Sequence, residues 1–184
     1  LGVSLFADRA ELVQDLTKDR DEANTAIDQY VAQGGTALYD AVALGMERMR
    51  QVKGRRAVVV LTDGRDENDA GTAPGSVRPF AAIERLAFET DVTIFAIGMG
   101  PSVDKARLDA LATKSGGLAL FPADPAALDT EYQKIVETLR RRYVLSYTSS
   151  NTTRDGKFRN VSIESAVPGT VVHQRGGYWA PDDG

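Results

Sequence analysis

The stretch AVVVLTDG, from Ala57 to Gly64, decides the fold class of this chain. Its valine-rich run predicts a strand that is buried on both faces, and its Thr62-Asp63-Gly64 end predicts a tight turn. The Asp63 carboxylate is therefore expected at the carboxyl end of a strand. Ligands bind at that edge in open α/β sheets, so Asp63 is the first candidate functional residue. The alternative is a turn aspartate that caps the following loop.

A pair of glycines before a helical pattern marks the second candidate. Gly34-Gly35-Thr36 places a hydroxyl group at the expected start of a helix, where glycine lets the backbone come close to a bound group. Thr36 can also be interpreted as a plain helix N-cap. Asp40, one turn later, could hold a water molecule beside a site, although a solvated helix position is an equally good interpretation.

The polar loop at 65–75 holds three carboxylates, Asp66, Glu67 and Asp69. Their spacing does not match that of a calcium-binding loop, so an acidic loop facing solvent is the favoured interpretation. The residues that we expect around a site at Asp63, rather than as its direct ligands, are Gly35, Asp40, Gly64 and Asp66.

Composition and charge limit the classes of function. The 184 residues, 42% hydrophobic and 26% charged, suffice for one globular domain with a sizeable core. A net charge of -4 and a pI near 5.1 argue against a nucleic-acid partner, because no basic stripe is available to replace phosphate counterions. The absence of cysteine excludes disulfides and thiolate metal sites and leaves oxygen ligands for any metal ion.

No apolar run in the sequence is long enough to span a membrane, and no signal peptide is present. The first residue, Leu1, suggests a processed product or an excised piece.

Strand and helix patterns alternate through residue 142. Apolar runs or strict alternation predict strands at 3–6, 11–15, 58–61, 92–97 and 118–121. Helical spacing predicts helices at 23–31, 38–50, 76–86, 105–114 and 124–142, with Ser76 and Asp124 as N-caps. The alternation predicts an α/β fold, in which a doubly wound, mostly parallel sheet carries helices on both faces.

The pattern changes after residue 142. Only strand patterns follow, at 143–147, 158–165 and 171–174, with turn chemistry at Asp155-Gly156 and Pro168-Gly169. We therefore expect an α/β domain at 1–142 and, packed on it, a small antiparallel β extension at 143–184.

Several segments, taken in order, carry a family resemblance. They read GGTALYDAV at 34–42, VVVLTDGRDEN at 58–68, VTIFAIGMG at 92–100 and LRRRYVLSY at 139–147, followed by DGKFRNVSI and QRGGYWAP. Over nearly the whole chain they resemble the bacterial von Willebrand factor A-related domains. The resemblance implies the same doubly wound fold and a metal ion-dependent adhesion site, in which a threonine and an aspartate that match Thr36 and Asp63 bind Mg2+, or Mn2+ or Ca2+.

The rest of that implied site has no counterpart in this sequence. In the family, a D-x-S-x-S loop on the central strand supplies further hydroxyls and an aspartate. That loop would lie upstream of Leu1, on a strand between those that match 3–6 and 58–61. Thr36 and Asp63 alone are too few for a hard cation that takes about six oxygens, unless water and other groups complete the shell. Without the middle strand, unpaired backbone and apolar faces are expected on both sides of the gap.

Three functions remain open from the sequence. The leading hypothesis is a non-enzymatic binding module that, when complete, uses a divalent metal ion to engage an acidic group on a protein partner. The second is a structural or assembly scaffold of the same fold without a working metal site. The third is a metal-assisted hydrolase with Asp63 as a ligand, but the sequence offers no strong general base, and the lone histidine, His173, lies far from Asp63 in sequence. By analogy with the family, we expect an extracytoplasmic location, either secreted or at the envelope.

Overall fold

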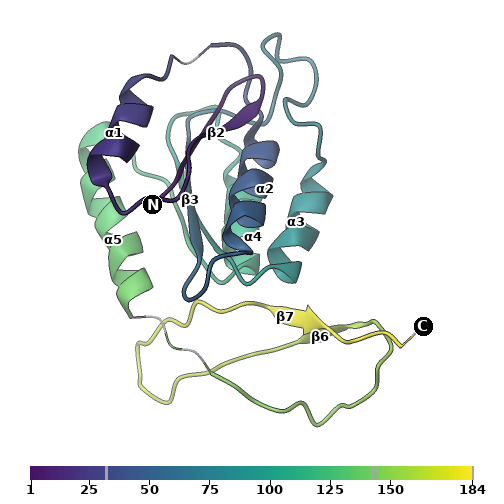
Figure 1. The fold of residues 1–184 in the computed structure, drawn as a ribbon. Helices are drawn as coiled ribbons and strands as arrows, with labels where there is room; N and C mark the ends of the chain where they lie inside the picture. Colours follow the sequence, from purple (N-terminus) through teal and green to yellow (C-terminus); the bar gives the residue numbers. More distant parts are fainter. Residues whose placement is uncertain (32, 142, 144, 184) are drawn as a thin grey trace.

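The computed structural model describes residues 1–31, 33–141, 143 and 145–183, and it is built around a three-stranded parallel sheet (Figure 1). The strands, in sheet order, are β3 (Ala57–Thr62), β4 (Thr93–Gly98) and β5 (Ala119–Leu120). One face is covered by α2 (Leu38–Met49), α3 (Phe80–Glu89) and α4 (Lys105–Lys114), and the other by α5 (Leu128–Arg140). This arrangement confirms the predicted α/β fold class. No helix in the described residues is both long and apolar enough to cross a membrane.

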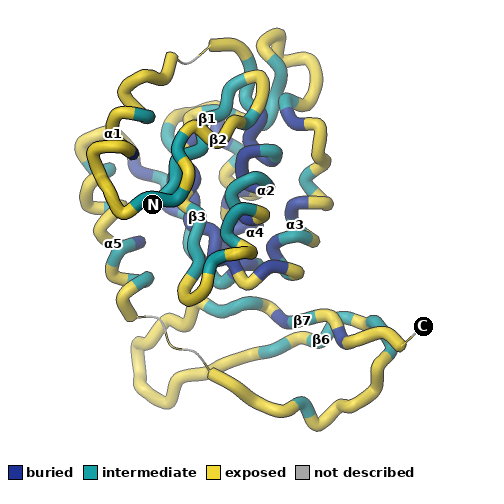
Figure 2. Tube along the Cα trace, in the orientation of Figure 1, coloured by how far each residue is buried: buried dark blue, intermediate teal, exposed yellow. Residues whose placement is uncertain are grey.

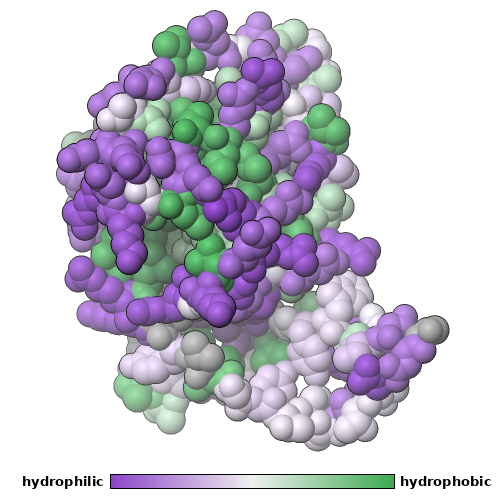
Figure 3. All heavy atoms as spheres, in the orientation of Figure 1, coloured by the Kyte–Doolittle hydropathy of each residue, from purple (hydrophilic) through white to green (hydrophobic). Residues whose placement is uncertain are grey.

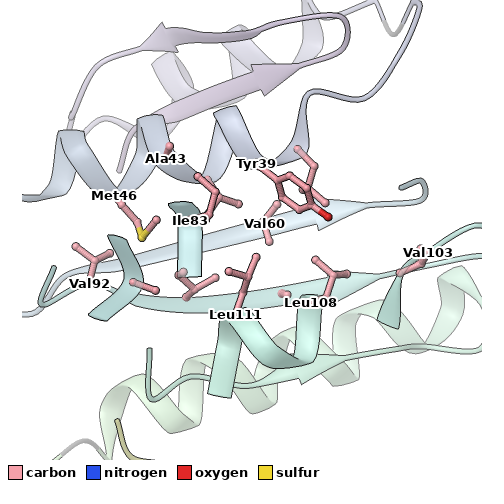
Figure 4. Packing of buried hydrophobic residues seen from close by; sticks show 14 residues of the cluster. Tyr39, Ala43, Met46, Val60, Ile83, Val92, Val103, Leu108 and Leu111 are labelled. Carbon is pink, nitrogen blue, oxygen red and sulfur yellow. The ribbon is translucent and has the colours of Figure 1, made fainter. Parts of the chain in front are cut away.

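Strand β4 is the centre of the hydrophobic core. All six of its residues are buried, because the strand is paired on both sides and covered on both faces. On the face toward α2, α3 and α4, the side chains that point toward one another include Met46, Val60, Ile83, Leu108 and Leu111 (Figure 4). Figure 2 shows that the buried residues concentrate in this sheet and in the helix faces that cover it.

The opposite face of the sheet has a smaller core and is less completely covered. Val59 and Leu61 of β3 face this side, because they are paired in the ladder with Phe95 and Ile97 of the smaller core. They are nevertheless 43% and 49% exposed. Helix α5 therefore covers β4 and β5 but leaves this part of β3 open. The buried residues of the smaller core are Phe95, Ile97, Leu120 and Ile135.

The N-terminal strands form a separate hairpin. Strands β1 (Val3–Phe6) and β2 (Ala10–Gln14) pair antiparallel, and no ladder joins them to β3 in the described part of the chain. Helix α2 packs against both hairpin strands and also against β3. This break in the sheet, with the exposed Val59 and Leu61 beside it, agrees with the gap expected from the sequence.

Helix α1 (Arg20–Asp28) packs on the hairpin. It begins where the Asp19 carboxylate accepts the Asp21 N–H at 2.8 Å, which is the geometry of an N-cap. Just beyond its end, the Tyr30 hydroxyl donates a hydrogen bond to the Phe6 carbonyl at 2.7 Å. This bond ties the end of the helical region to β1.

Helix α3 starts later than the sequence predicts. It begins at Phe80 with Pro79 as its N-cap, and Ser76 is not a cap. The Ser76 hydroxyl instead donates a hydrogen bond to the Asp66 carboxylate. The prediction was wrong because the Ser76 hydroxyl oxygen accepts the Asp40 N–H and so serves the N-terminus of α2 instead of α3.

The predicted helix at 124–142 is divided into two parts. Asp124 is an N-cap, but it caps the single 3-10 turn η1 (Pro125–Ala127), where its carboxylate accepts the Ala127 N–H at 3.0 Å. The α-helix α5 then runs from Leu128 to Arg140. Residue 142, at the predicted end, lies outside the described residues.

The C-terminal β extension is antiparallel, as predicted, but most of its strands lie elsewhere. Strand β6 (Phe158–Asn160) covers only the start of the predicted strand at 158–165, and it pairs with β7 (Gly177–Trp179). The predicted strands at 143–147 and 171–174 are wrong, since the described residues of both ranges are not in strands, and residue 144 lies outside the description.

Side-chain packing explains why 177–179 takes the place beside β6. The Phe158 ring packs edge-on against Trp179 with centroids 5.3 Å apart. A Cβ at Gly177 would collide with the Arg159 carbonyl, so the close approach of the two strands needs glycine there. Neither the ring contact nor the close approach of the strands can be predicted from the alternation of apolar and polar residues along the sequence.

The extension docks on the C-terminal end of α3. Arg175 Nη2 donates hydrogen bonds to the carbonyl oxygens of Ala87 (3.1 Å), Phe88 (2.7 Å) and Thr90. The Phe88 ring packs on Phe158 with centroids 5.0 Å apart. A guanidinium group suits this position, because the last carbonyls of a helix lack helical partners and carry partial negative charge. In Figure 1 the extension lies at the end of the molecule opposite the turn between β1 and β2.

We expect Val60→Ala to destabilise the protein by about 2 kcal/mol, because it removes two methyl groups from a packed site in which Val60 is only 5% exposed. Val59→Ala on the same strand should cost less than about 1 kcal/mol, because Val59 is 43% exposed. Urea unfolding followed by circular dichroism measures both changes. Equal losses at the two positions would contradict an open outer face of β3.

We expect Arg175→Met to loosen the β extension by about 1.5–3 kcal/mol, the range for hydrogen bonds made by a charged group. Hydrogen exchange should rise in β6 and β7 and stay slow in β4. Arg154→Met is the matched control, because Arg154 pairs with Asp183 at the exposed surface of the same extension. Unchanged protection of β6 in Arg175→Met would contradict the docking role.

Candidate functional site

The loops at the carboxyl ends of β3 and β4 meet at one edge of the sheet. The ladder continues past both strands, because the Met99 N–H donates to the Thr62 carbonyl at 3.0 Å. The next loop residue, Gly100, lies so close that a Cβ on it would be 3.7 Å from the Asp63 carbonyl oxygen. Asp63 is thus at the carboxyl edge of a parallel sheet, where its sequence position predicts it.

The Asp63 side chain is exposed, and it makes no hydrogen bond or ion pair with the residues that the structure describes. Thr62 shapes the turn behind it, since its hydroxyl accepts the Gly64 N–H and donates to the Gly64 carbonyl, both at 3.3 Å. A turn aspartate that caps the following loop would need a carboxylate bond that is not found in the described chain. The Asp63 carboxylate is therefore free to bind another group.

The Thr36 hydroxyl lies beside the same turn. A Cβ at Gly64 would be 3.3 Å from Thr36 Oγ1, a tight contact, so the absence of a side chain at Gly64 favours the close approach of the two loops. The Thr36 backbone is fixed by its N–H, which donates to the Glu67 carbonyl at 2.7 Å. The N-cap of α2 is Ala37, so Thr36 is not the helix cap of the alternative interpretation. Its hydroxyl has no hydrogen-bond partner among the described residues.

The glycines before Thr36 are needed by the protein's own packing. A Cβ on Gly35 would lie 2.7 Å from the Glu67 carbonyl oxygen, and the Gly35 N–H donates to Asp8 Oδ1 at 2.6 Å. Gly34 has a φ of +79°, and a Cβ on it would collide with the Asp8 carboxylate. Asp8 belongs to the turn between β1 and β2, and sequence reasoning gave it no role. The available signal was its position, since it is an acidic residue just after a strand at the same edge.

Asp66 fixes the loop that follows β3 onto the start of α2. Its Oδ1 accepts the Tyr39 N–H at 3.1 Å, and its Oδ2 accepts the Ser76 N–H at 3.1 Å. The Ser76 hydroxyl donates to Asp66 and accepts the Asp40 N–H at 3.0 Å. Asp66 and Ser76 together therefore satisfy two of the N–H groups that a helix N-terminus leaves without partners.

Asp40 completes this connection from the helix side. Its carboxylate accepts the Val77 N–H at 2.8 Å and the Arg78 N–H at 3.1 Å. Both of these bonds hold the far end of the same loop. Asp40 and Asp66 are therefore engaged by backbone groups, and each has a structural reason to be at this edge.

A cation lies on the other side of the α2 N-terminus. Arg107 of α4 donates from Nη1 to the Tyr39 hydroxyl at 2.8 Å, and its guanidinium lies 5.2 Å from the Phe80 ring centroid. Burial raises the pKa of the Tyr39 phenol, an effect that the bond from Arg107 opposes. Arg107 was not singled out from the sequence, because its ring contacts come from elements far apart in the chain. His173, in contrast, is exposed in the segment between β6 and β7.

The oxygen atoms at this edge suit a hard cation in kind but not in number. Thr36 offers a neutral hydroxyl and Asp63 a carboxylate, and Mg2+ prefers such oxygens. Within the described residues, no group of three or more His, Asp or Glu side chains lies close enough together to hold a metal ion. The two donors thus fit part of a shell of about six oxygens, and water or another molecule would have to supply the remainder.

Curated relatives at low identity include the inter-alpha-trypsin inhibitor heavy chain H4 of Sus scrofa, which is 26% identical over 156 residues. The alignment covers 78% of this chain but only 16% of that protein. The Bos taurus protein of the same name is 26% identical over 151 residues, and the alignment again covers 16% of its length. The chain therefore spans only a small part of the curated relatives that it matches.

Solved structures agree on the fold. The conserved hypothetical protein BatB from Bacteroides thetaiotaomicron superposes with a TM-score of 0.60 at 14% identity, covering 77% of this chain and 79% of that one. The von Willebrand factor type A protein from Catenulispora acidiphila also gives 0.60, at 20% identity, covering 75% of this chain and 33% of that one. The family model of the von Willebrand factor type A domain matches residues 1–137. Because this match takes in well over half of the residues, the chain belongs to the von Willebrand factor type A domain family.

Proposed function

We propose that this chain is a non-enzymatic protein-interaction domain that binds its partner through a divalent metal ion. Thr36 and Asp63 are the ligands that the chain supplies, for Mg2+ or for Mn2+ or Ca2+. The partner is a protein that presents an acidic group. Gly35 and Gly64 give the ligand loops their close approach, while Asp40 and Asp66 hold the surrounding loop in place.

One observation carries this proposal. Asp63 and Thr36 have side-chain oxygens without partners among the described residues, whereas Asp40 and Asp66 at the same edge are occupied by backbone N–H groups. Asp63 and Thr36 thus offer oxygen atoms that the described protein does not use, on two loops that come close together at Gly64. Binding a cation is the chemistry that uses both groups.

The two donors also account for the acidic partner. Thr36 contributes a neutral oxygen and leaves the positive charge of an ion unreduced, and Asp63 contributes a single negative charge. The supply of only two protein ligands leaves several positions to water and to an incoming group. A carboxylate from the partner would both complete the shell and neutralise the remaining charge.

A scaffold without a metal site is the second candidate. It is favoured by the lack of any cluster of three His, Asp or Glu side chains in the described chain. A metal-assisted hydrolase has less support, because no general base has been identified beside Asp63.

We further propose that residues 1–142 form the interaction domain and that 143–184 form its β extension. We also propose that the protein acts outside the cytoplasm, either secreted or at the envelope, as its family membership suggests.

Isothermal titration with MnCl2 and MgCl2 tests the ligand set. We expect saturable binding to the full chain. Asp63→Asn and Thr36→Val should each weaken the binding by at least about tenfold, because the first removes the negative charge of a ligand and the second removes a ligand oxygen. Asp69→Asn is the matched control, because Asp69 is an exposed carboxylate of the same loop and should leave the titration unchanged.

The outcomes separate the two candidates. Equal heats from Asp63→Asn and the wild-type chain would contradict the assigned ligands. No saturable binding by the wild-type chain would favour the scaffold. In that case an acidic partner protein should bind equally well with and without a chelator, if it binds at all.

We expect Gly34→Ala to destabilise the protein by about 1–3 kcal/mol because of its unfavourable φ, and to weaken Mn2+ binding because the new Cβ would displace the Asp8 carboxylate from the Gly35 N–H. Gly169→Ala is the matched control, with a φ of +76° against +79° at Gly34 but no atom within 4 Å of the added Cβ. Thermal unfolding measures both. Equal losses from the two substitutions would mean that the Asp8 contact has no part in holding the Thr36 loop.

A further inference from the structure

A cleft of about 670 Å³ lies between the β1–β2 hairpin and α1, and neither Thr36 nor Asp63 lines it. Its floor is apolar, with Leu5 and Val13 from the hairpin and Tyr30 and Val31 from the end of the α1 region. A second hollow of about 410 Å³ shares Leu5, Val13 and Tyr30 with it and is also lined by Asp8, Arg9 and Glu11, and we call the two together the groove. On the molecular face drawn in Figure 3, hydrophobic residues lie among hydrophilic ones beside a hollow in the surface.

The apolar groups of this groove are unusually open to solvent. Val13 is 42% exposed, Tyr30 is 37% exposed and Val31 is 68% exposed. The groove is not the result of a loose helix, because the Tyr30 hydroxyl is bonded to the Phe6 carbonyl at 2.7 Å. Grouped apolar exposure on an otherwise fixed surface is typical of a docking site.

The rim of the main cleft carries charge of one sign. Asp19, Asp21 and Glu22, at the start of α1, line it, and no Lys or Arg does. Asp19 is occupied as the helix cap, while Asp21 and Glu22 have no ion-pair partner among the described residues. Lys18 and Arg20 are next to Asp19 in sequence but do not line the cleft. The second hollow adds Asp8 and also Arg9, which is paired with Glu11, so the residues that line the groove carry a negative net charge beside the apolar side chains.

We propose that this groove docks a basic segment of a partner protein, in which apolar side chains are flanked by lysine or arginine. The apolar side chains would cover Val13, Tyr30 and Val31, and the cations would pair with Asp21 and Glu22. Charge complementarity selects this occupant, because an acidic segment would be repelled by the rim and by the net charge of -4. The groove thus requires the opposite charge from the acidic group proposed for the metal edge, and the two surfaces can be tested separately.

The test uses fluorescence anisotropy with the full chain and a labelled amidated peptide, Lys-Leu-Lys-Lys-Leu-Lys-Lys-Leu. Two control peptides replace every Lys by Glu or every Leu by Ser. We expect micromolar binding of the first peptide, at least about tenfold weaker binding of both controls, and a clear loss of affinity between about 0.05 and 0.5 M NaCl, where exposed charges become screened. EDTA should have no effect, so a failure of the metal proposal leaves this result unchanged.

Variants assign the binding to the groove. Asp21→Asn with Glu22→Gln should weaken it by about fivefold and flatten its salt dependence, because the rim charge is lost. Val13→Thr keeps the shape of the side chain and should weaken binding by a similar factor at every salt concentration. The matched controls are Asp109→Asn on α4 and Val171→Thr in the extension, both exposed and away from the groove.

The proposal fails if the basic apolar peptide does not bind, or if the control variants lose as much affinity as the groove variants. It also fails if the acidic peptide binds equally well. Sedimentation velocity gives a further outcome, since self-association that Val13→Thr abolishes would make the groove a contact between two copies of this chain. Circular dichroism confirms folding, and Val31→Thr replaces Val13→Thr if the latter is unfolded.

Discussion

The ladder between β3 and β4 is the constraint on which the rest of the structure depends. It runs without interruption from the pair Ala57 and Thr93 to the pair Thr62 and Gly98. Because both strands point the same way and stay in register, their following loops must begin side by side. The buried faces of the same two strands then fix where α2 can lie, and the start of α2 receives the loops that surround Asp63.

The carboxylates at this edge divide into two kinds. Asp8, Asp40 and Asp66 each accept backbone N–H groups of residues at least ten positions away, and so determine the shape of the edge. Asp63 accepts none in the described chain and lies on the surface that the others have shaped. A rigid frame around one free carboxylate reduces the conformational entropy that is lost on binding, because few protein groups have to be immobilised when a ligand binds.

Local pattern was sufficient for the fold class and for elements whose burial follows their own sequence. The helix at 105–114 was predicted with the bounds that α4 has, and the strand predicted at 92–97 differs from β4 by one residue at each end. The candidate ligands Thr36 and Asp63 followed from their positions before a helix and after a buried strand, together with the family resemblance. Contacts across the chain could not be predicted in this way. Whether Ser76 caps a helix or binds Asp66 is decided only when the loop folds back, and the Asp8 carboxylate reaches an N–H 27 residues away.

The lack of a ladder between the hairpin and β3 has an energetic consequence for the N-terminal third of the chain. Strands β1 and β2 and helix α1 are held to the sheet through packing on α2, through the bond from Gly35 to Asp8 and through the ion pair of Arg48 with Asp15. None of these links is a continuous row of backbone hydrogen bonds, so this region can open without breaking the β3–β4 ladder. Opening of this region would therefore leave the backbone hydrogen bonds of the β3–β4 ladder intact, and the Thr36 loop is the segment of chain that joins the two regions.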